Sequence, residues 1–157
     1  GFAAVDWTRT RAYALGLNSI FINRTGREAH GIVAADEAGQ IKQQIMTSLP
    51  GLLDQKNDLQ VVTDVFDGAV LYPGNANQDA PDLVIGYAPG FRASWQTTLG
   101  GVPGSLLDDN NRKWSGDHCI TPEAVPGVLF TSFKPETPLT SLPGVARYDR
   151  THWKVLP

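Results

Sequence analysis

The sequence predicts a single domain of the mixed α/β class, and three observations support that prediction. The 16 glycines and 11 prolines among 157 residues indicate many turns and a modest helix content. One stretch has the four-residue apolar spacing of a helix, and several short apolar runs have the length of strands. A chain of this length with 41% apolar residues can enclose one ordinary core.

Three strands are predicted in the first 68 residues. The runs Ala12–Leu15 and Ile20–Ile22 flank Gly16-Leu17-Asn18, as two strands flank the turn of a hairpin. A third strand is predicted over Leu59–Phe66, because Asp58 and Gly68 bound a run of strand-forming residues. Alternation places three side chains of this run on one face, namely Val61, Thr63 and Val65.

A helix is predicted between the hairpin and the third strand. It starts at Asp36-Glu37, whose acidic side chains suit a first helical turn, and Pro50-Gly51 disturbs its end. The apolar stripe that predicts it recurs every four residues, at Ile41, Ile45, Leu49 and Leu53.

The second half contains two further apolar runs of strand length. Asp82–Tyr87 leads into a Pro-Gly turn, and a stretch dominated by loops follows as far as Glu123. Gly127–Ser132 is the second run, and Lys134-Pro135 closes it. The period of residues 138–157 is too weak to predict an element.

Composition excludes several classes of function. A net charge of −3, with 18% charged residues and no basic run, does not suit binding to a nucleic-acid backbone. The longest apolar runs fall far short of the roughly 20 residues of a membrane-spanning helix. The sequence also lacks a phosphate loop of the GxxxxGK type, a His-Glu-x-x-His pair and a GxSxG elbow.

The densest group of chemically active residues is Trp114–Cys119, where Asp117 and His118 adjoin Gly116. An imidazole and a carboxylate are metal ligands, but consecutive side chains usually diverge, so His118 is the better ligand and Asp117 a supporting group. The alternative is that Asp117 caps a turn, His118 is an ordinary histidine and Cys119 is a small buried apolar residue.

An ordered series of short motifs covers roughly the first 130 residues. The series resembles the type I phosphodiesterase and nucleotide pyrophosphatase family of the alkaline phosphatase superfamily. Its members here are Val5–Ala14, Ile22-Asn23, Gly26–Glu28, Gly31–Val33, Pro81–Leu83, Gly86-Tyr87, Gly90–Ser94, Trp114–Cys119 and Val125–Phe130.

The resemblance implies a partial alkaline-phosphatase-like mixed sheet with a small strand-helix-strand cap portion. Within the single domain 1–157, the cap-like insertion would span 11–68 and the carboxyl-terminal sheet flank with its metal loop 80–135. Enzymes of the family hold two metal ions, usually zinc, between Asp and His side chains and attack the phosphoester with a Thr or Ser. The late metal-binding histidine of the family matches His118, with Asp117 beside it.

Other parts of the family pattern have no counterpart in this chain. The early metal-binding aspartate, the nucleophile and the mid-chain Asp-His-Gly ligand segment are missing. The expectation is therefore a carboxyl-terminal part of a metal-dependent phosphoester hydrolase, inactive alone, with no catalytic residue of its own. The complete protein would act on a small phosphoester or a nucleotide.

Three residues are candidates for substrate binding. Tyr87 and Arg92 flank the turn at the end of an apolar strand, where α/β sheets commonly place binding groups. Arg27 lies in the cap-like insertion and has the planar fork that suits an anion. The alternatives are that Tyr87 is a core aromatic, that Arg92 covers apolar surface, and that Arg27 forms a solvated turn or a surface pair with Glu28.

A function of another class is also open. The chain could be a non-catalytic binding or assembly module that kept a sheet edge and self-associates through an exposed face. A part of an enzyme should expose a broad apolar face where the absent part packs, whereas a module should have a closed core.

Overall fold

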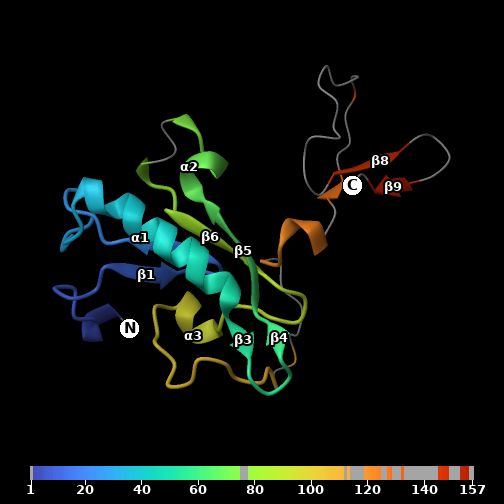
Figure 1. Ribbon diagram of the computed structural model, residues 1–157, viewed down its shortest axis with the longest axis horizontal. Helices are drawn as coiled ribbons and strands as arrows, with labels where there is room; N and C mark the ends of the chain where they lie inside the picture. Colours follow the sequence, from blue (N-terminus) through green and yellow to red (C-terminus); the bar gives the residue numbers. More distant parts are fainter. Residues whose placement is uncertain are drawn as a thin grey trace.

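The computed structural model describes residues 2–74, 78–111, 113, 119–124, 127–128, 132, 145–148 and 153–155. A four-stranded antiparallel sheet forms its main body, and helix α1 lies across one face of this sheet (Figure 1). The helix and the strands, in sheet order, are α1 (Ala35–Ser48), β1 (Ala12–Leu15), β2 (Ser19–Ile22), β6 (Leu83–Tyr87) and β5 (Val62–Asp67). The mixed α/β class is confirmed, whereas the alkaline-phosphatase-like fold stays a prediction.

Shorter elements complete the described chain, and two further sheets join some of them. Strands β3 and β4 pair with each other, whereas β7 runs parallel to β8, which pairs with β9. The tail that the sequence left unassigned thus contains β8 and β9. These elements are η1 (Phe2–Ala4), η2 (Leu49–Gly51), β3 (Leu53–Asp54), β4 (Leu59–Gln60), α2 (Gly68–Leu71), α3 (Trp95–Thr98), η4 (Pro122–Ala124), β7 (Gly127–Val128), β8 (Val145–Tyr148) and β9 (Trp153–Val155).

The predicted hairpin is confirmed. Strands β1 and β2 pair in antiparallel register, with Tyr13 opposite Phe21. Strand β6, which the sequence also predicts, pairs with β2 on one side and β5 on the other. The portions 11–68 and 80–135 therefore share one sheet, because a strand of the second lies between two strands of the first.

The predicted helix is confirmed as α1, which ends at Ser48. The Glu37 carboxylate accepts a hydrogen bond from the Ala34 amide at 3.2 Å, which satisfies a donor at the helix start. Ile41 is buried, but the last position of the predicted stripe, Leu53, is 46% exposed and lies in β3. The stripe stops early because Pro50 and Gly51 form the short helix η2 and turn the chain away.

The strand predicted over Leu59–Phe66 is divided between β4 and β5. The register of β5 against β6 shifts between Val62 and Asp64, so the strict alternation expected from the sequence is interrupted. Val61, Val62 and Val65 are buried, whereas Thr63 is only half-buried. Thr63, the middle position of the predicted face, is therefore less buried than Val61 and Val65.

The core lies between α1 and the facing side of the sheet. Two neighbouring clusters form it, and Ala12 and Ile45 pack against both. Burial of such apolar area stabilises the fold by roughly 25 cal/mol per Å². The buried members are Ile20, Val61, Val62, Val65, Leu83 and Ile85 in one cluster and Ile22, Val33, Ala38 and Ile41 in the other.

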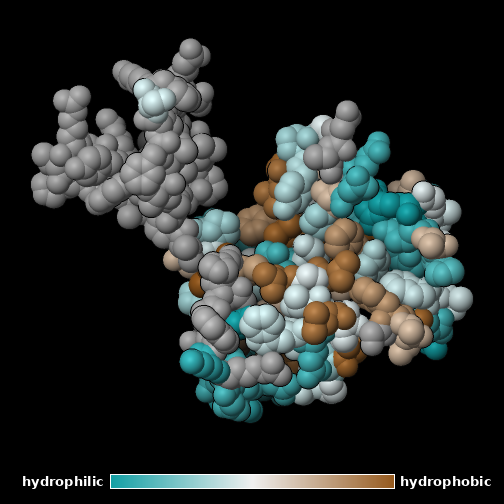
Figure 2. All heavy atoms as spheres, turned by 180° about the vertical axis from the view of Figure 1, so that it is seen from behind, coloured by the Kyte–Doolittle hydropathy of each residue, from teal (hydrophilic) through white to brown (hydrophobic). Residues whose placement is uncertain are grey.

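The face of the sheet away from α1 is apolar and only partly covered. Register pairs Tyr13 with Phe21 and Phe66 with Val84 on this face, and all four side chains are half-buried. Figure 2 views the molecule from behind and shows apolar residues gathered there. Elsewhere on the surface, the loop after α3 exposes Leu99, Val102 and Leu106, each at least 79% exposed.

Candidate functional site

The three candidate substrate-binding residues fall at the two ends of β6. Arg27 contacts Asp82, which precedes the strand, whereas Tyr87 ends it and Arg92 follows. Five residue steps of about 3.3 Å separate Asp82 from Tyr87, or roughly 16 Å. The structure therefore places Tyr87 and Arg92 on either side of one turn and Arg27 apart from them.

At the carboxyl end of β6, a tight turn reverses the chain. The Phe91 amide donates to the Ala88 carbonyl at 3.0 Å, and Gly90 has a φ of 90°. Proline second and a left-handed glycine third are the preferences of a type II turn. The Ala88 amide also donates to the Val61 carbonyl at 3.1 Å, so the turn is fixed to the residue just before β5.

Tyr87 joins this turn to a distant part of the sequence. Its carbonyl accepts a hydrogen bond from the Thr121 amide at 2.9 Å, and it forms an isolated parallel bridge with Ile120. The ring of Tyr87 packs against the larger core cluster, as does Phe91. The side chain of Tyr87 thus packs like a core aromatic, and its part in substrate binding stays a prediction.

Arg92 lies on the ring of a tryptophan. The carbon at the centre of its guanidinium is 4.7 Å from the centre of the Trp95 ring, within the range of a cation–π interaction. Trp95 is 42% exposed, so its ring is not a core residue. Trp7 does serve packing, since its ring contacts those of Phe2 and Tyr13.

The predicted metal ligands Asp117 and His118 lie outside the described residues. Cys119 is half-buried, and Ile120, two residues after His118 in the sequence, is the residue that bridges Tyr87. Within the described part of the chain, no group of three or more His, Cys, Asp or Glu side chains could hold a metal ion. The described residues alone therefore do not fit a zinc site.

At the amino end of β6, two arginines converge on one buried carboxylate. The Asp82 side chain is 8% exposed, and its Oδ2 accepts hydrogen bonds from the Ile22 amide at 2.7 Å and from Arg27 Nη2 at 2.6 Å. Arg24 Nη2 lies 3.7 Å from the other carboxylate oxygen. This group, which we call the clasp, joins the loop after β2 to the start of β6.

Glu28 completes the clasp. Its Oε1 accepts from Arg27 Nε at 2.6 Å, and its Oε2 accepts from the Arg24 amide at 2.8 Å. Burial by itself would lower the pKa of Arg27, but the bonds to Asp82 and Glu28 outweigh it and raise the pKa. The Arg27–Glu28 pair exists as the sequence suggested, although both side chains are largely buried rather than solvated.

Neighbouring residues fit the clasp closely. A Cβ on Gly31 would lie 2.0 Å from the Arg24 carbonyl oxygen, so only glycine fits there. Asn23 is fully buried, and its Nδ2 is within hydrogen-bonding distance of the carbonyls of Trp7, Thr10 and His30. Burial, followed by the Glu28 carboxylate, raises the pKa of Tyr13. These contacts make the clasp a structural junction.

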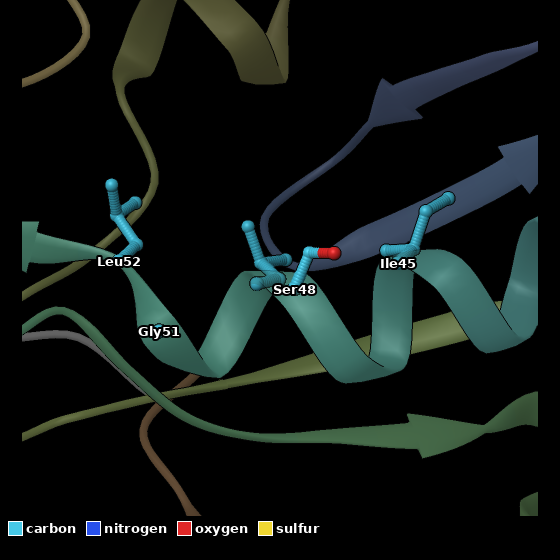
Figure 3. A pocket seen from close by; sticks show the side chains of 5 residues that line it. Ile45, Ser48, Gly51 and Leu52 are labelled. Atoms are coloured by element: carbon cyan, nitrogen blue, oxygen red, sulfur yellow. The ribbon is translucent and has the colours of Figure 1, made fainter.

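A shallow apolar hollow of about 440 Å³ lies at the end of α1 (Figure 3). Its lining contains one hydroxyl and no charged group, and it includes none of the predicted site residues. The lining residues are Ile45, Ser48, Leu49, Gly51 and Leu52. The hollow lacks the convergent polar groups of a catalytic site.

Sequence reasoning missed two residues that organise these sites. Asp82 was recognised as part of a motif, but nothing in the sequence indicated that Arg27, 55 positions earlier, would bind it. The spacing of Arg92 and Trp95 gave no usable signal, because Arg92 precedes the N-cap of α3 and the rule for helical side chains three apart does not apply to it.

Comparison with known proteins leaves the family assignment open. No protein-family model, curated protein or solved structure matches this chain. Among the described residues, no helix is long and apolar enough to cross a membrane.

Proposed function

We propose that this chain is a carboxyl-terminal portion of a metal-dependent phosphoester hydrolase, of the phosphodiesterase or nucleotide pyrophosphatase type, and that it is inactive alone. His118 is a ligand of a divalent metal, zinc by preference, and Asp117 supports it. Arg92 contacts the phosphoryl group of a small phosphoester or nucleotide. The two-metal centre of such an enzyme polarises the phosphoryl group when it is complete.

One observation carries the proposal furthest, namely the contact between Tyr87 and the segment Ile120-Thr121. Two motifs of the ordered series, Gly86-Tyr87 and Trp114–Cys119, are far apart in the sequence. The bridge joins Ile120, the residue directly after the second motif, to Tyr87 in the first. The Tyr87–Arg92 turn is thus next to the chain that leaves the predicted metal loop.

The apolar face of the sheet away from α1 favours the hypothesis that the chain is a portion of an enzyme over the hypothesis that it is a module with a closed core. Phe66 and Val84 are half-buried there, and the loop after α3 separately exposes Leu99, Val102 and Leu106. A module with a closed core has little reason to expose such residues, whereas a part of a larger protein packs them against the remainder. Self-association through this face is the prediction of the alternative, an assembly module.

Zinc content tests the proposal. Purified chain would be compared with a version extended at its amino end by the preceding residues of its gene, after dialysis against zinc and then zinc-free buffer. We expect zinc to remain in the extended protein, and His118→Ala to reduce it. His30→Ala is the matched control, because His30 is an exposed histidine outside the predicted metal loop.

Two results would contradict the proposal. Stoichiometric zinc in the short chain would mean that its site is complete. Equal zinc in the extended protein with and without His118 would remove this residue from the ligand set. Sedimentation of the short chain tests the alternative, because an assembly module should form a defined oligomer.

A further inference from the structure

Asn23-Arg24-Thr25 has the Asn-x-Thr pattern at which a glycan can be attached to an asparagine. The pattern is short and common, so its meaning depends on where the fold places the acceptor side chain. Thr25 is exposed, whereas Asn23 is 0% exposed. One of the two residues that define the pattern is therefore accessible in the folded chain, and the other is not.

The atom that would carry the glycan already has partners. Nδ2 of Asn23 lies 2.8 Å from the Thr10 carbonyl oxygen and 3.1 Å from that of His30. The Trp7 carbonyl oxygen is 3.3 Å away. The two N–H groups of this amide thus face three buried or half-buried acceptors, and they join segments that lie before and after Asn23 in the sequence.

The backbone of the pattern is also bound. The Asn23 amide donates to the Arg11 carbonyl at 2.9 Å, and the Asn23 carbonyl accepts from the Val33 amide at 2.9 Å. The Thr25 amide donates to the Val33 carbonyl at 2.9 Å. A transferase that draws this segment into its own active site must first break these bonds, so modification requires local opening of the fold.

A glycan on Asn23 would in turn prevent these contacts. In the reaction the asparagine nitrogen forms a bond to C1 of a sugar, the bond from C1 to a lipid pyrophosphate breaks, and the amide loses one proton. The product keeps a single N–H and carries a bulky, hydrophilic group. Buried carbonyls around Asn23 would lose their donor, and the sugar has no space at a fully buried side chain.

We propose that glycosylation of Asn23 and formation of the clasp exclude each other. The unfolded chain is an acceptor for a lipid-linked oligosaccharide, whereas the folded chain is not. The clasp is involved because Arg24, which follows Asn23 directly, and Arg27 bind Asp82 from the same loop. This exclusion is independent of the proposed hydrolase activity.

The accessibility of Asn23 is tested by incubating the purified chain with a eukaryotic oligosaccharyltransferase and its lipid-linked donor. Mass spectrometry of the Asn23 peptide measures the modified fraction. The Asp82→Ala variant, which lacks the clasp carboxylate, should be modified faster than the unmodified chain by on the order of a hundredfold, because its open population is larger. Adding Thr25→Ala to that variant removes the pattern but keeps Asn23, and should abolish modification.

The effect of the glycan on folding is tested on the modified molecules. They would be collected on a lectin, unfolded in urea and diluted, with Thr25→Ala carried through the same urea steps as the control for refolding. We expect the control to regain its circular dichroism spectrum and the glycosylated chain to remain unfolded.

Three results would overturn the proposal. Modification of the unmodified chain as fast as that of Asp82→Ala would show that Asn23 is accessible in the fold. A glycosylated chain that regains the spectrum and the urea midpoint of the control would show that the clasp tolerates the glycan. No modification of Asp82→Ala, once its unfolding is shown by circular dichroism, would show that the open chain is not an acceptor.

Discussion

The two ends of β6 each hold an arginine that the sequence marked for substrate binding, and the surroundings of the two differ. At the amino end, Arg27 bonds to the carboxylates of Asp82 and Glu28 within a largely buried junction. At the carboxyl end, Arg92 lies on the exposed ring of Trp95, beside a turn. Arg27, whose nitrogens bind two carboxylates in a buried junction, serves the fold first, whereas the guanidinium of Arg92 lies on a ring at the surface.

The sharpest test of this difference is the loss of the clasp carboxylate. Asp82→Ala should lower the free energy of unfolding by about 3 kcal/mol, because Arg24 and Arg27 lose their shared partner and the Ile22 amide loses its acceptor. Urea denaturation followed by circular dichroism measures this. Asp64→Ala, on the exposed side of β5, should change stability by less than about 0.5 kcal/mol. Equal effects of the two variants would break the comparison.

A methyl group inside the clasp should act in the same direction. Gly31→Ala should cost about 2 kcal/mol, because the new Cβ would meet the Arg24 carbonyl oxygen at 2.0 Å. Gly104→Ala is the control, since a Cβ there has no atom within 4 Å. Thermal unfolding of both variants would show it, and an unchanged midpoint for Gly31→Ala would contradict the close packing of this loop.

The turn at the other end of β6 should be more tolerant. Gly90→Ala should cost only about 1 kcal/mol, because the φ of 90° is strained for alanine but a Cβ has open space. Chemical denaturation measures the cost. A loss as large as that of Gly31→Ala would mean that the turn end is packed as closely as the clasp end.

The smallest expected effect is a loss of folding stability at acid pH. It arises at the amino end of β6, where Asp67 lies opposite Leu83. Burial alone would raise the pKa of Asp67, but the hydrogen bonds from Lys42 at 2.6 Å and from the Ala69 amide outweigh it and lower the pKa. A carboxyl with a lowered pKa in the folded state stabilises the fold at pH values above its ordinary 3.8. This stability is lost as the pH falls through the lowered value.

Asp67→Asn should remove that part of the acid dependence, at a cost of under about 1 kcal/mol at neutral pH. Unfolding free energies of both proteins between pH 7 and the acid range, taken in roughly half-unit steps, measure it. The two curves should converge in acid, and parallel curves would contradict a role for the Lys42 pair.

The sequence predicted the elements whose signals are local. The hairpin, α1 and β6 follow from spacing and from turn residues, and the bend at Pro50 was visible as a disturbance. The sheet order was not predictable, because β6 pairs with β2 through contacts between residues about 60 positions apart. The register shift between Val62 and Asp64 was not predictable either, because the alternation of residue types does not reveal it.

The candidate site was predictable only in part. The placement of Tyr87 and Arg92 on either side of one turn follows from their positions in the sequence. The binding of Arg27 to Asp82 could not be predicted, because the side chain of an arginine is the same whether its partner is a substrate or a buried carboxylate. The sequence also does not show that Trp95 is exposed, because a large aromatic ring is more often packed in the core.

Turnover of a simple phosphodiester by the short chain and by the extended protein, side by side in the presence of zinc, tests the central claim most directly. The account predicts hydrolysis by the extended protein alone. In the extended protein, His118→Ala should abolish activity and His30→Ala should leave it unchanged. Hydrolysis by the short chain itself, or none by the extended protein when it is folded and loaded with zinc, would contradict it.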